Sequence, residues 1–247
     1  MQLEEFFQEN PRLALAFSGG TDSALVLYLA KKYGCDLHAY FVKGPFQPRF
    51  ELHDARRLSD QYDVPMTVLE FDALAHPQIR ANAPDRCYHC KHAVFECILH
   101  AAQADGYTLL IDGTNASDDD ADRPGMQALK ELQVRSPLRE CGITKPQVRA
   151  LSREAGLFTW DKPAYACLAT RIPTGTELDA DTLQRVEYAE DVLHGLGFSD
   201  FRVRVVGTMA KIQLPEAQFC RVLEQREHIL KTLGERFADV VLDLKPR

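Results

Sequence analysis

The sequence is organised around the stretch Leu13-Ala-Leu-Ala-Phe-Ser-Gly-Gly-Thr-Asp-Ser-Ala-Leu-Val-Leu27. Its first residues are continuously apolar, as is typical of a central parallel strand that is covered on both faces. Leu25, Tyr28 and Leu29 then follow the spacing of a helix. The stretch therefore predicts a buried strand, a glycine turn and the start of a helix.

The turn predicts a phosphate-binding loop. Gly19 and Gly20 permit positive φ angles and a close approach of the backbone to a ligand, and N–H groups at the helix start face an anion. Ser18 and Ser23 add hydroxyl donors. Neither Lys-Ser nor Lys-Thr follows the glycines, so the loop is not of the type used for γ-phosphoryl transfer. An ordinary glycine-rich turn is the alternative interpretation.

The run Ser-Gly-Gly-Thr-Asp-Ser resembles the PP-loop of the ATP pyrophosphatases. The resemblance implies that ATP is split into AMP and pyrophosphate and that an adenylate is left on the substrate. Asp22 would help to hold Mg²⁺. The residues expected to bind ATP here are Ser18, Gly19, Gly20, Thr21, Asp22 and Ser23.

Strands and helices alternate after this loop, which predicts an α/β fold with a parallel twisted, Rossmann-like sheet and ligands at the carboxyl strand ends. The expected strands are 13–17, 37–42, 66–71 and 107–111, and the expected helices are 22–33, 50–62, 86–103 and one that starts after Thr144. Val42 would form a wall for the adenine. Gly113 and Thr114 would contact the nucleotide, with a simple turn as the alternative.

Composition changes near residues 173–177, which we interpret as a linker. Beyond it we expect a helix at 180–194, strands at 201–206 and 211–214, a helix at 216–233 and a strand at 240–244. Apolar stripes on both helices, the second including Leu223 and Leu230, should be core. The expected domains are therefore a PP-loop domain, 1–173, and a small α+β substrate-binding or oligomerisation domain, 178–247.

Net charge and hydropathy limit the partners and the cellular location that we expect for the protein. A net charge of −7 over 247 residues gives no electrostatic footprint for nucleic acid. We expect no membrane span and no signal peptide, and hence a cytoplasmic protein. Seven cysteines are then reduced thiols, metal ligands or catalysts, not disulfides.

Three cysteines are candidates for chemistry. Cys87 and Cys90 form a Cys-x-x-Cys at a helix start, and Cys167 lies far along the chain. The pair alone fits half a zinc site, a redox pair or part of an iron–sulfur site. His89 and His92 could supply further zinc ligands, so a zinc site stays among the alternatives. We expect the remaining thiols to be buried: Cys35, Cys97, Cys141 and Cys220.

The whole chain resembles the LarE family of PP-loop sulfur transferases. The matching motifs are residues 18–23, 86–91, 112–115 with Arg123-Pro-Gly125, 166–173 and Arg202-Val-Arg204. The resemblance implies adenylation of the carboxylates of pyridinium-3,5-biscarboxylic acid mononucleotide and their conversion to thiocarboxylates for nickel-pincer nucleotide biosynthesis. It also implies a homo-oligomer and sulfide or another sulfur donor.

The resemblance assigns roles to the cysteines and arginines. In some members the cysteine at the position of Cys167 is sacrificed and becomes dehydroalanine, whereas members with two further cysteines carry a 4Fe-4S cluster, and Cys87 and Cys90 place this chain with them. The expected substrate-binding residues are Arg123, Arg171, Arg202 and Arg204. Gln213 stands where an acid is expected, so the role of that acid is open.

Four other functions remain as alternatives. A PP-loop tRNA thiolase shares the adenylation chemistry, and a sacrificial-cysteine transferase with a structural zinc shares the cysteines. An amide-forming synthetase would not need the three cysteines. A non-catalytic, zinc-stabilised protein would bind ATP without turnover.

Overall fold

The computed structural model describes residues 2–118 and 124–247. The chain divides into two compact units. The first comprises Met1–Asp72 and Asp85–Lys162, and the second comprises Ala73–Pro84 and Pro163–Arg247. The second unit thus begins before the expected linker at 173–177 and also takes in a short segment from earlier in the chain.

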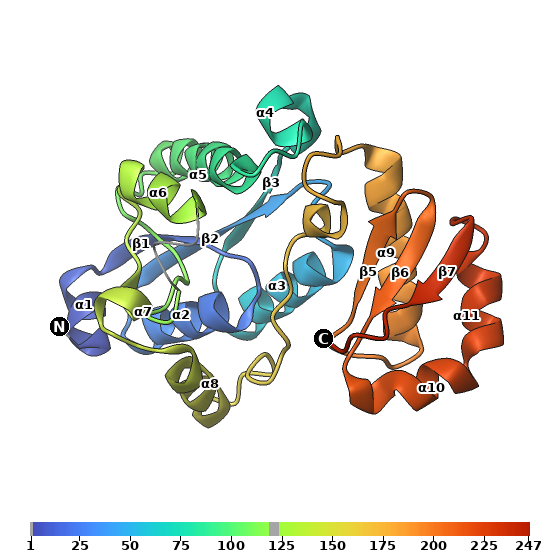
Figure 1. The fold of residues 1–247 in the computed structure, drawn as a ribbon. Coiled ribbons are helices and arrows are strands. Elements are labelled where there is room, and N and C mark those ends of the chain that lie inside the picture. Colours follow the sequence, from blue (N-terminus) through green and yellow to red (C-terminus); the bar gives the residue numbers. More distant parts are fainter. Residues whose placement is uncertain (1, 119–123) are drawn as a thin grey trace. The chain divides into compact units, whose positions relative to one another are not determined.

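The first unit is built on a parallel four-stranded sheet with the order β3-β2-β1-β4 (Figure 1). Its strands are β1 (Arg12–Ala16), β2 (Asp36–Lys43), β3 (Met66–Glu70) and β4 (Leu110–Ile111). The α/β prediction is confirmed. The strand expected at 107–111 pairs with β1 only through its last residues, since Ala14 and Leu15 are matched with Leu110 and Ile111.

Helices cover both faces of this sheet because its side chains alternate. On one face Leu13, Leu15 and Phe17 pack in a core shared with α1 (Leu3–Glu9), α2 (Thr21–Lys32), α3 (Arg49–Gln61) and α8 (Lys145–Glu154). On the other face Ala14 and Tyr40 pack with α5 (Arg86–Ala104) and α6 (Pro124–Glu131). The short helix α7 (Pro137–Glu140) precedes α8.

Gly19 is required by the packing of the phosphate loop. Its φ of +69° lies in the left-handed region. A Cβ atom there would also lie 3.0 Å from the backbone N of Ala55 and the carbonyl O of Glu51, both in α3. Neither backbone atom can move without shifting the helix.

Replacing Gly19 by alanine is therefore expected to lower the free energy of unfolding by about 2–4 kcal/mol, from left-handed strain plus overpacking. Gly34→Ala is the control, because Gly34 has a φ of +77° but nothing lies within 4 Å of the point that a Cβ atom would occupy. The free energy of unfolding of this variant should fall only by the cost of left-handed strain, about 1–2 kcal/mol. Urea unfolding of both variants measures the difference, and equal losses would show that α3 does not restrict Gly19.

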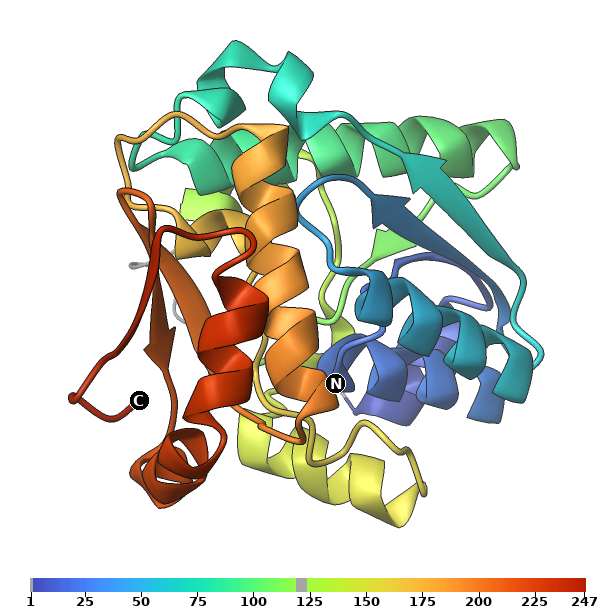
Figure 2. The ribbon, with the colours of Figure 1, turned by 90° about the vertical axis from the view of Figure 1, so that its right-hand side faces the viewer.

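The second unit holds a three-stranded sheet with the order β5-β6-β7. β5 (Arg202–Val206) and β6 (Met209–Gln213) are antiparallel, and β7 (Asp239–Leu242) is parallel to β6. The helix α9 (Ala180–Gly195) contacts β5, and α11 (Arg226–Leu233) contacts α9 and β7 (Figure 2). The unit also contains η1 (Ala73–Ala75), α4 (Pro77–Arg80), η2 (Leu168–Arg171), η3 (Glu216–Gln218) and α10 (Phe219–Glu224).

The helix expected at 216–233 is broken into η3, α10 and α11, with Gln225 between the last two. Val222, Ile229 and Leu233 are buried as expected. Leu223 and Leu230, however, are 56% and 48% exposed, so their placement in the core was wrong. Each directly follows a buried residue and is rotated about 100° from it, which carries it to the solvent edge of the apolar stripe.

All seven cysteines lie in the described part of the chain, and none is in a disulfide. Cys35 is buried, Cys97 and Cys141 are half-buried, and burial raises the pKa of all three thiols. Cys220 is exposed on α10, so the expectation that it is buried was wrong. No described helix is long and apolar enough to cross a membrane.

Candidate functional site

The phosphate loop lies at the carboxyl end of β1, between the strand and the first turn of α2. Hydroxyl groups order it from within: the Oγ atoms of Ser18 and Ser23 are 3.1 Å apart, and the Gly20 N–H donates to Ser18 Oγ at 3.3 Å. Thr21 is buried and donates to the carbonyl of Thr159 at 2.8 Å. The hydroxyls therefore shape the loop while Ser18 itself is exposed.

Asp22 occupies the first turn of α2 and is half-buried. Its Oδ1 accepts a hydrogen bond from Asn115 Nδ2 at 3.1 Å, and its Oδ2 lies 2.5 Å from Lys145 Nζ. Lys145, the first residue of α8, was missed in the sequence analysis. Three segments far apart in the chain thus meet at one carboxylate.

The loop after β4 packs directly against the start of α2. A Cβ atom on Gly113 would lie 2.7 Å from the backbone N of Ser23, so only glycine fits there. The buried Asp112 holds the turn, because its carboxylate accepts from the Thr114 backbone N–H at 3.1 Å and from Ser136 Oγ at 2.7 Å. The first unit therefore brings residues 112–115 to the phosphate loop, as the sheet topology predicts.

The end of β2 lies at the same edge of the sheet, since its neighbours run parallel to it. Val42 is buried, with 7% of its surface exposed. After it, the Gly44 N–H donates to Gln47 Oε1 at 3.0 Å, and a Cβ atom on Gly44 would lie 2.5 Å from the Phe71 carbonyl O. The contact of Val42 with adenine stays a prediction.

Cys87 lies in the first turn of α5 and Cys90 lies three positions later, hence on the same side of the helix. Cys87 is exposed and Cys90 is half-buried. The guanidinium Nη2 of the buried Arg86 lies 3.5 Å from Cys87 Sγ, which places a cation beside the thiol. His89 and His92 are engaged by carboxylates of Asp85 and Glu96, each at 3.2 Å.

The described residues contain no cluster of three or more His, Cys, Asp or Glu side chains arranged to hold a metal ion. Cys87 and Cys90 belong to the first unit and Cys167 belongs to the second. Cysteine thiolates are the usual ligands of iron–sulfur clusters, so the residue type suits such a centre. The cluster stays a proposal. Arg123, which was expected to bind substrate, lies outside the described residues.

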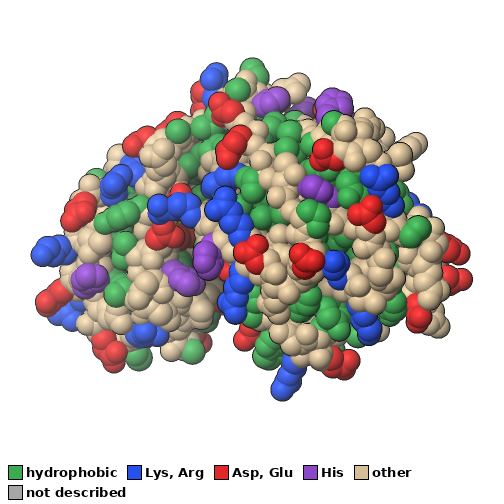
Figure 3. All heavy atoms as spheres, turned by 180° about the vertical axis from the view of Figure 1, so that it is seen from behind, with side chains coloured by type: hydrophobic (Ala, Val, Ile, Leu, Met, Phe, Trp, Pro, Cys, Tyr) green, Lys and Arg blue, Asp and Glu red, His purple; other side chains and the backbone are tan. Residues whose placement is uncertain are grey.

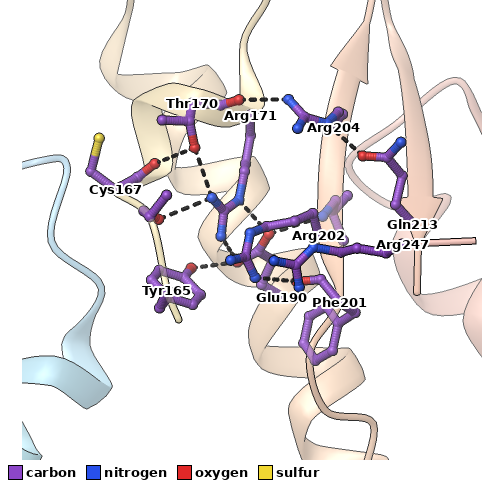
Figure 4. A network of polar contacts seen from close by, with 12 residues as sticks. Tyr165, Cys167, Thr170, Arg171, Glu190, Phe201, Arg202, Arg204, Gln213 and Arg247 are labelled. Carbon is purple, nitrogen blue, oxygen red and sulfur yellow. Dashed lines mark hydrogen bonds and ion pairs between the residues drawn. The ribbon is translucent and has the colours of Figure 1, made fainter. Parts of the chain in front are cut away.

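Cys167 immediately precedes η2 in the second unit and is half-buried. Its carbonyl O accepts from the backbone N–H and the hydroxyl of Thr170, at 3.0 and 2.8 Å. Figure 4 shows its sulfur pointing away from the arginines that support the loop. The backbone of this cysteine is fixed by the turn that follows it.

Arg171 is 1% exposed and is engaged entirely by the second unit. It donates to Glu190 through Nε at 2.7 Å and Nη2 at 3.1 Å, and through Nη1 to the Ala166 carbonyl at 2.9 Å (Figure 4). Glu190 also accepts from Tyr165 Oη and, at 2.9 Å, from the Val203 N–H. This buried pair therefore ties the loop that carries Cys167 to α9 and β5.

Replacing Glu190 by alanine is expected to lower the free energy of unfolding by about 3–5 kcal/mol, because it leaves the buried Arg171 cation without its partner. Asp181→Ala is the control in the same helix, since Asp181 is 78% exposed in its pair with Arg185. It should cost about 0.5 kcal/mol or less. Chemical unfolding measures both variants, and a small loss for Glu190→Ala would contradict the assigned support.

Arg202 and Arg204 share one face of β5 but differ in exposure. Arg202 is buried and donates to the carbonyls of Phe201 and Ala164, at 2.7 and 2.5 Å. Its burial, together with nearby Arg171 and Arg247, lowers its pKa to about 10. Arg204 is exposed.

Gln213 orients Arg204 without neutralising it. Arg204 Nε donates to Gln213 Oε1 at 2.5 Å, and Nη1 donates to the Thr170 carbonyl at 2.9 Å. The Gln213 amide in turn donates to Asp243 Oδ2 at 2.6 Å. Hydrogen bonds from Gln213 and Lys211 lower the pKa of Asp243 to about 2. The two acceptors that hold Arg204, the Gln213 amide oxygen and the Thr170 carbonyl, are both uncharged, which suits a site for an anionic ligand.

Surface charge on the visible face is mixed. Figure 3 shows both basic and acidic side chains across that face. Mixed charge of this kind agrees with the overall net charge of −7.

Comparison with known proteins gives relatives along nearly the whole chain. An uncharacterized protein of Synechocystis sp. is 40% identical over 98% of this chain and 92% of its own length. Pyridinium-3,5-bisthiocarboxylic acid mononucleotide synthase of Lactiplantibacillus plantarum is 34% identical over 94% of this chain and 86% of its own length.

A more distant similarity extends to a tRNA-specific 2-thiouridylase of Clostridium botulinum, which is 24% identical over 61% of this chain and 52% of its own length. No protein-family profile matches the chain.

Proposed function

The chain belongs to the pyridinium-3,5-bisthiocarboxylic acid mononucleotide synthase family, and from this premise we propose that it is an ATP-dependent, AMP-forming sulfur transferase. Its substrate would be pyridinium-3,5-biscarboxylic acid mononucleotide, whose carboxylates become thiocarboxylates for nickel-pincer nucleotide biosynthesis. The LarE resemblance read from the sequence is confirmed at the level of the family. The observation that carries the proposal is the loop of residues 18–23, with Asp22 in the first turn of α2.

Adenylation would make the substrate carboxylate reactive toward a nucleophile. A carboxylate resists nucleophiles because attack would place more charge on an anion. In the proposed step a carboxylate oxygen attacks the α-phosphorus of ATP, the bond to the β-phosphate breaks, and pyrophosphate leaves. Loop N–H groups at the start of α2 would stabilise the departing pyrophosphate. The Asp22 carboxylate suits Mg²⁺, which prefers oxygen ligands and would supply charge stabilisation when bound.

Sulfur then displaces AMP from the acyl adenylate. In one route the Cys167 thiolate attacks the acyl carbon, AMP leaves, and cleavage of the cysteine Cβ–S bond with loss of the Cα proton gives the thiocarboxylate and dehydroalanine. In the route that we favour, Cys87, Cys90 and Cys167 would hold a 4Fe-4S cluster, which when bound supplies an open iron for sulfide. This choice rests on the family resemblance and on the presence of the three thiols.

Arginines of the second unit would bind the anionic nucleotide substrate. Arg204 is the best placed, because its exposed guanidinium is oriented by Gln213 and by the Thr170 carbonyl. Arg202 would act with it from the same face of β5. The described position of Arg171 instead favours support of the cysteine loop, so its contact with substrate would be indirect.

Replacing Arg204 by alanine is expected to lower the affinity for the nucleotide substrate about tenfold to a hundredfold, because a charge-assisted hydrogen bond contributes about 1.5–3 kcal/mol. The affinity for ATP should stay within about twofold of the wild-type value. Arg221→Ala is the control, because Arg221 is an exposed arginine of the same unit that donates to the carbonyls of Leu196 and Gly197. Calorimetric titration with each ligand makes the comparison. Equal weakening of both ligands would contradict the assignment.

Sulfide or another sulfur donor would supply the sulfur, and the working form would be a homo-oligomer, as the resemblance implies. The location would be cytoplasmic, as the sequence predicts. The principal rival is tRNA thiolation, favoured by the similarity to a tRNA-specific 2-thiouridylase. An anaerobic assay with ATP, Mg²⁺ and sulfide separates the two. Mass spectrometry should detect thiocarboxylate in the pyridinium nucleotide and no thionucleoside in tRNA. The reverse pattern would overturn the proposal.

A further inference from the structure

Lys145 is the nearest described cation to the metal-binding carboxylate proposed above. Its Nζ lies 2.5 Å from Asp22 Oδ2, with the two side chains 31% and 24% exposed. Asn115 binds the other oxygen of the same carboxylate at 3.1 Å. In this arrangement both oxygens of Asp22 are already engaged by the chain itself.

The backbone delivers Lys145 to this position. Thr144 caps the start of α8 and forms a capping box with Gln147, so the helix start is fixed. The Lys145 backbone N–H donates to Ser117 Oγ at 2.9 Å, and the Ala116 N–H donates to the Ile143 carbonyl at 2.8 Å. These bonds join the start of α8 to the loop that follows β4.

The phosphate loop itself supplies no lysine, although ATP brings several negative charges to it. A cation from another element is therefore needed beside the phosphates. A lysine side chain suits this task because its four-carbon stem is flexible and its ammonium group is a compact point charge. A metal ion that takes Asp22 Oδ2 as a ligand would also repel the ammonium group from that oxygen.

We propose that Lys145 exchanges partners: it neutralises Asp22 when the site is without nucleotide and binds a phosphate oxygen of ATP when Mg²⁺ and ATP are present. Lys145 is thus the cationic phosphate ligand that this loop lacks. The inference rests on the proposed binding of ATP at residues 18–23. It assigns Lys145 to the ATP site and makes Lys145 and the metal ion compete for Asp22.

The exchange predicts opposite effects on two ligands. Without nucleotide, Lys145 competes with a divalent cation for Asp22, so Lys145→Ala should bind the cation more tightly. With nucleotide, the variant lacks a phosphate ligand and should bind ATP about tenfold to a hundredfold more weakly. A lysine that only supports the fold would not strengthen cation binding on removal.

The experiment uses the full chain with Mn²⁺ alone, followed by electron paramagnetic resonance, and with Mg²⁺ and a non-cleavable α,β-methylene analogue of ATP, followed by calorimetry. Lys145→Ala should tighten Mn²⁺ binding and weaken the ATP analogue. Lys145→Arg should retain part of the ATP affinity because it restores the charge. Arg153→Ala, the control, removes a cation from the last turn of the same helix and should change neither affinity.

Unfolding in urea checks that the variants remain folded, and Lys145→Gln repeats the test with a side chain that still donates to Asp22. Unchanged ATP affinity in Lys145→Ala and Lys145→Gln, with the wild type binding ATP, would overturn the partner exchange alone. Weaker Mn²⁺ binding in both variants would also overturn it. A wild type that binds no ATP analogue would overturn the proposed function and this inference together.

Discussion

Asp22→Asn is expected to lower the rate of AMP formation from ATP by a factor on the order of a thousand, since charge stabilisation by a bound metal ion contributes several kcal/mol and each 1.4 kcal/mol is about tenfold. The amide keeps the shape of the side chain and an oxygen that accepts from Asn115, but it loses the charge. Measuring AMP and pyrophosphate release with saturating substrate gives the effect directly.

Asp54→Asn is the matched control for this variant. Asp54 pairs with Lys162 at 2.6 Å, with both side chains 21% exposed, so its removal also breaks a half-buried Asp–Lys pair of the first unit. Both variants should lose similar stability, and only Asp22→Asn should lose AMP formation. Comparable activity losses would show that the effect comes from the fold and not from the metal site.

Cys167→Ala is expected to abolish sulfur transfer completely while AMP still forms. In one proposed route Cys167 donates the sulfur and in the other it would help to hold the cluster, and both roles come after adenylation. Cys220→Ala, which removes an exposed thiol of the same unit, is the control. Chromatography of nucleotide products together with mass spectrometry of the pyridinium product measures the two half-reactions separately. Thiocarboxylate formed by Cys167→Ala would contradict the assignment.

Cys87 and Cys90 decide between the two sulfur routes. If the three cysteines act together, Cys87→Ala and Cys90→Ala should lose iron and sulfur transfer in parallel, and the wild type should turn over repeatedly when supplied with sulfide. Full activity in both variants, with dehydroalanine at Cys167 after one turnover, would instead establish the sacrificial route. Iron content and intact-protein mass distinguish these outcomes.

The sequence was sufficient for the sheet and the phosphate loop because both rest on local patterns. Continuous apolar strands predict a parallel sheet, and the glycine turn after β1 predicts a loop at its carboxyl end. Thr144, with Pro146 in the first helical turn after it, likewise predicts the capped start of α8. Each of these features is decided by neighbours along the chain.

Lys145 could not be found in this way. Its partner Asp22 is 123 positions away in the chain, and an isolated lysine at a helix start carries no distinctive pattern. Only the fold brings the two side chains together. The Gln225 break was missed for a related reason, since no glycine or proline marks it.

Glu190, in contrast, left a signal that could have been used. It lies four positions after Val186 and three before Leu193, both buried, and so falls on the apolar stripe of α9. An acid at such a position requires a buried partner, which Arg171 provides. Pairing the two in advance would have predicted a supporting role for Arg171 beside the substrate role inferred from the resemblance.

Transfer of a labelled oxygen from the substrate to AMP tests whether an acyl adenylate forms, because only an acyl adenylate moves a substrate oxygen onto AMP. The substrate carries oxygen-18 in both carboxylates and is incubated with ATP, Mg²⁺ and sulfide, and the AMP is then analysed by mass spectrometry. Attack on the α-phosphorus makes the carboxylate oxygen the bridging atom, and sulfur attack on the acyl carbon leaves that oxygen with phosphorus. We predict one labelled oxygen in each AMP, in step with the thiocarboxylate formed. Unlabelled AMP, or ADP as the nucleotide product, would contradict the account.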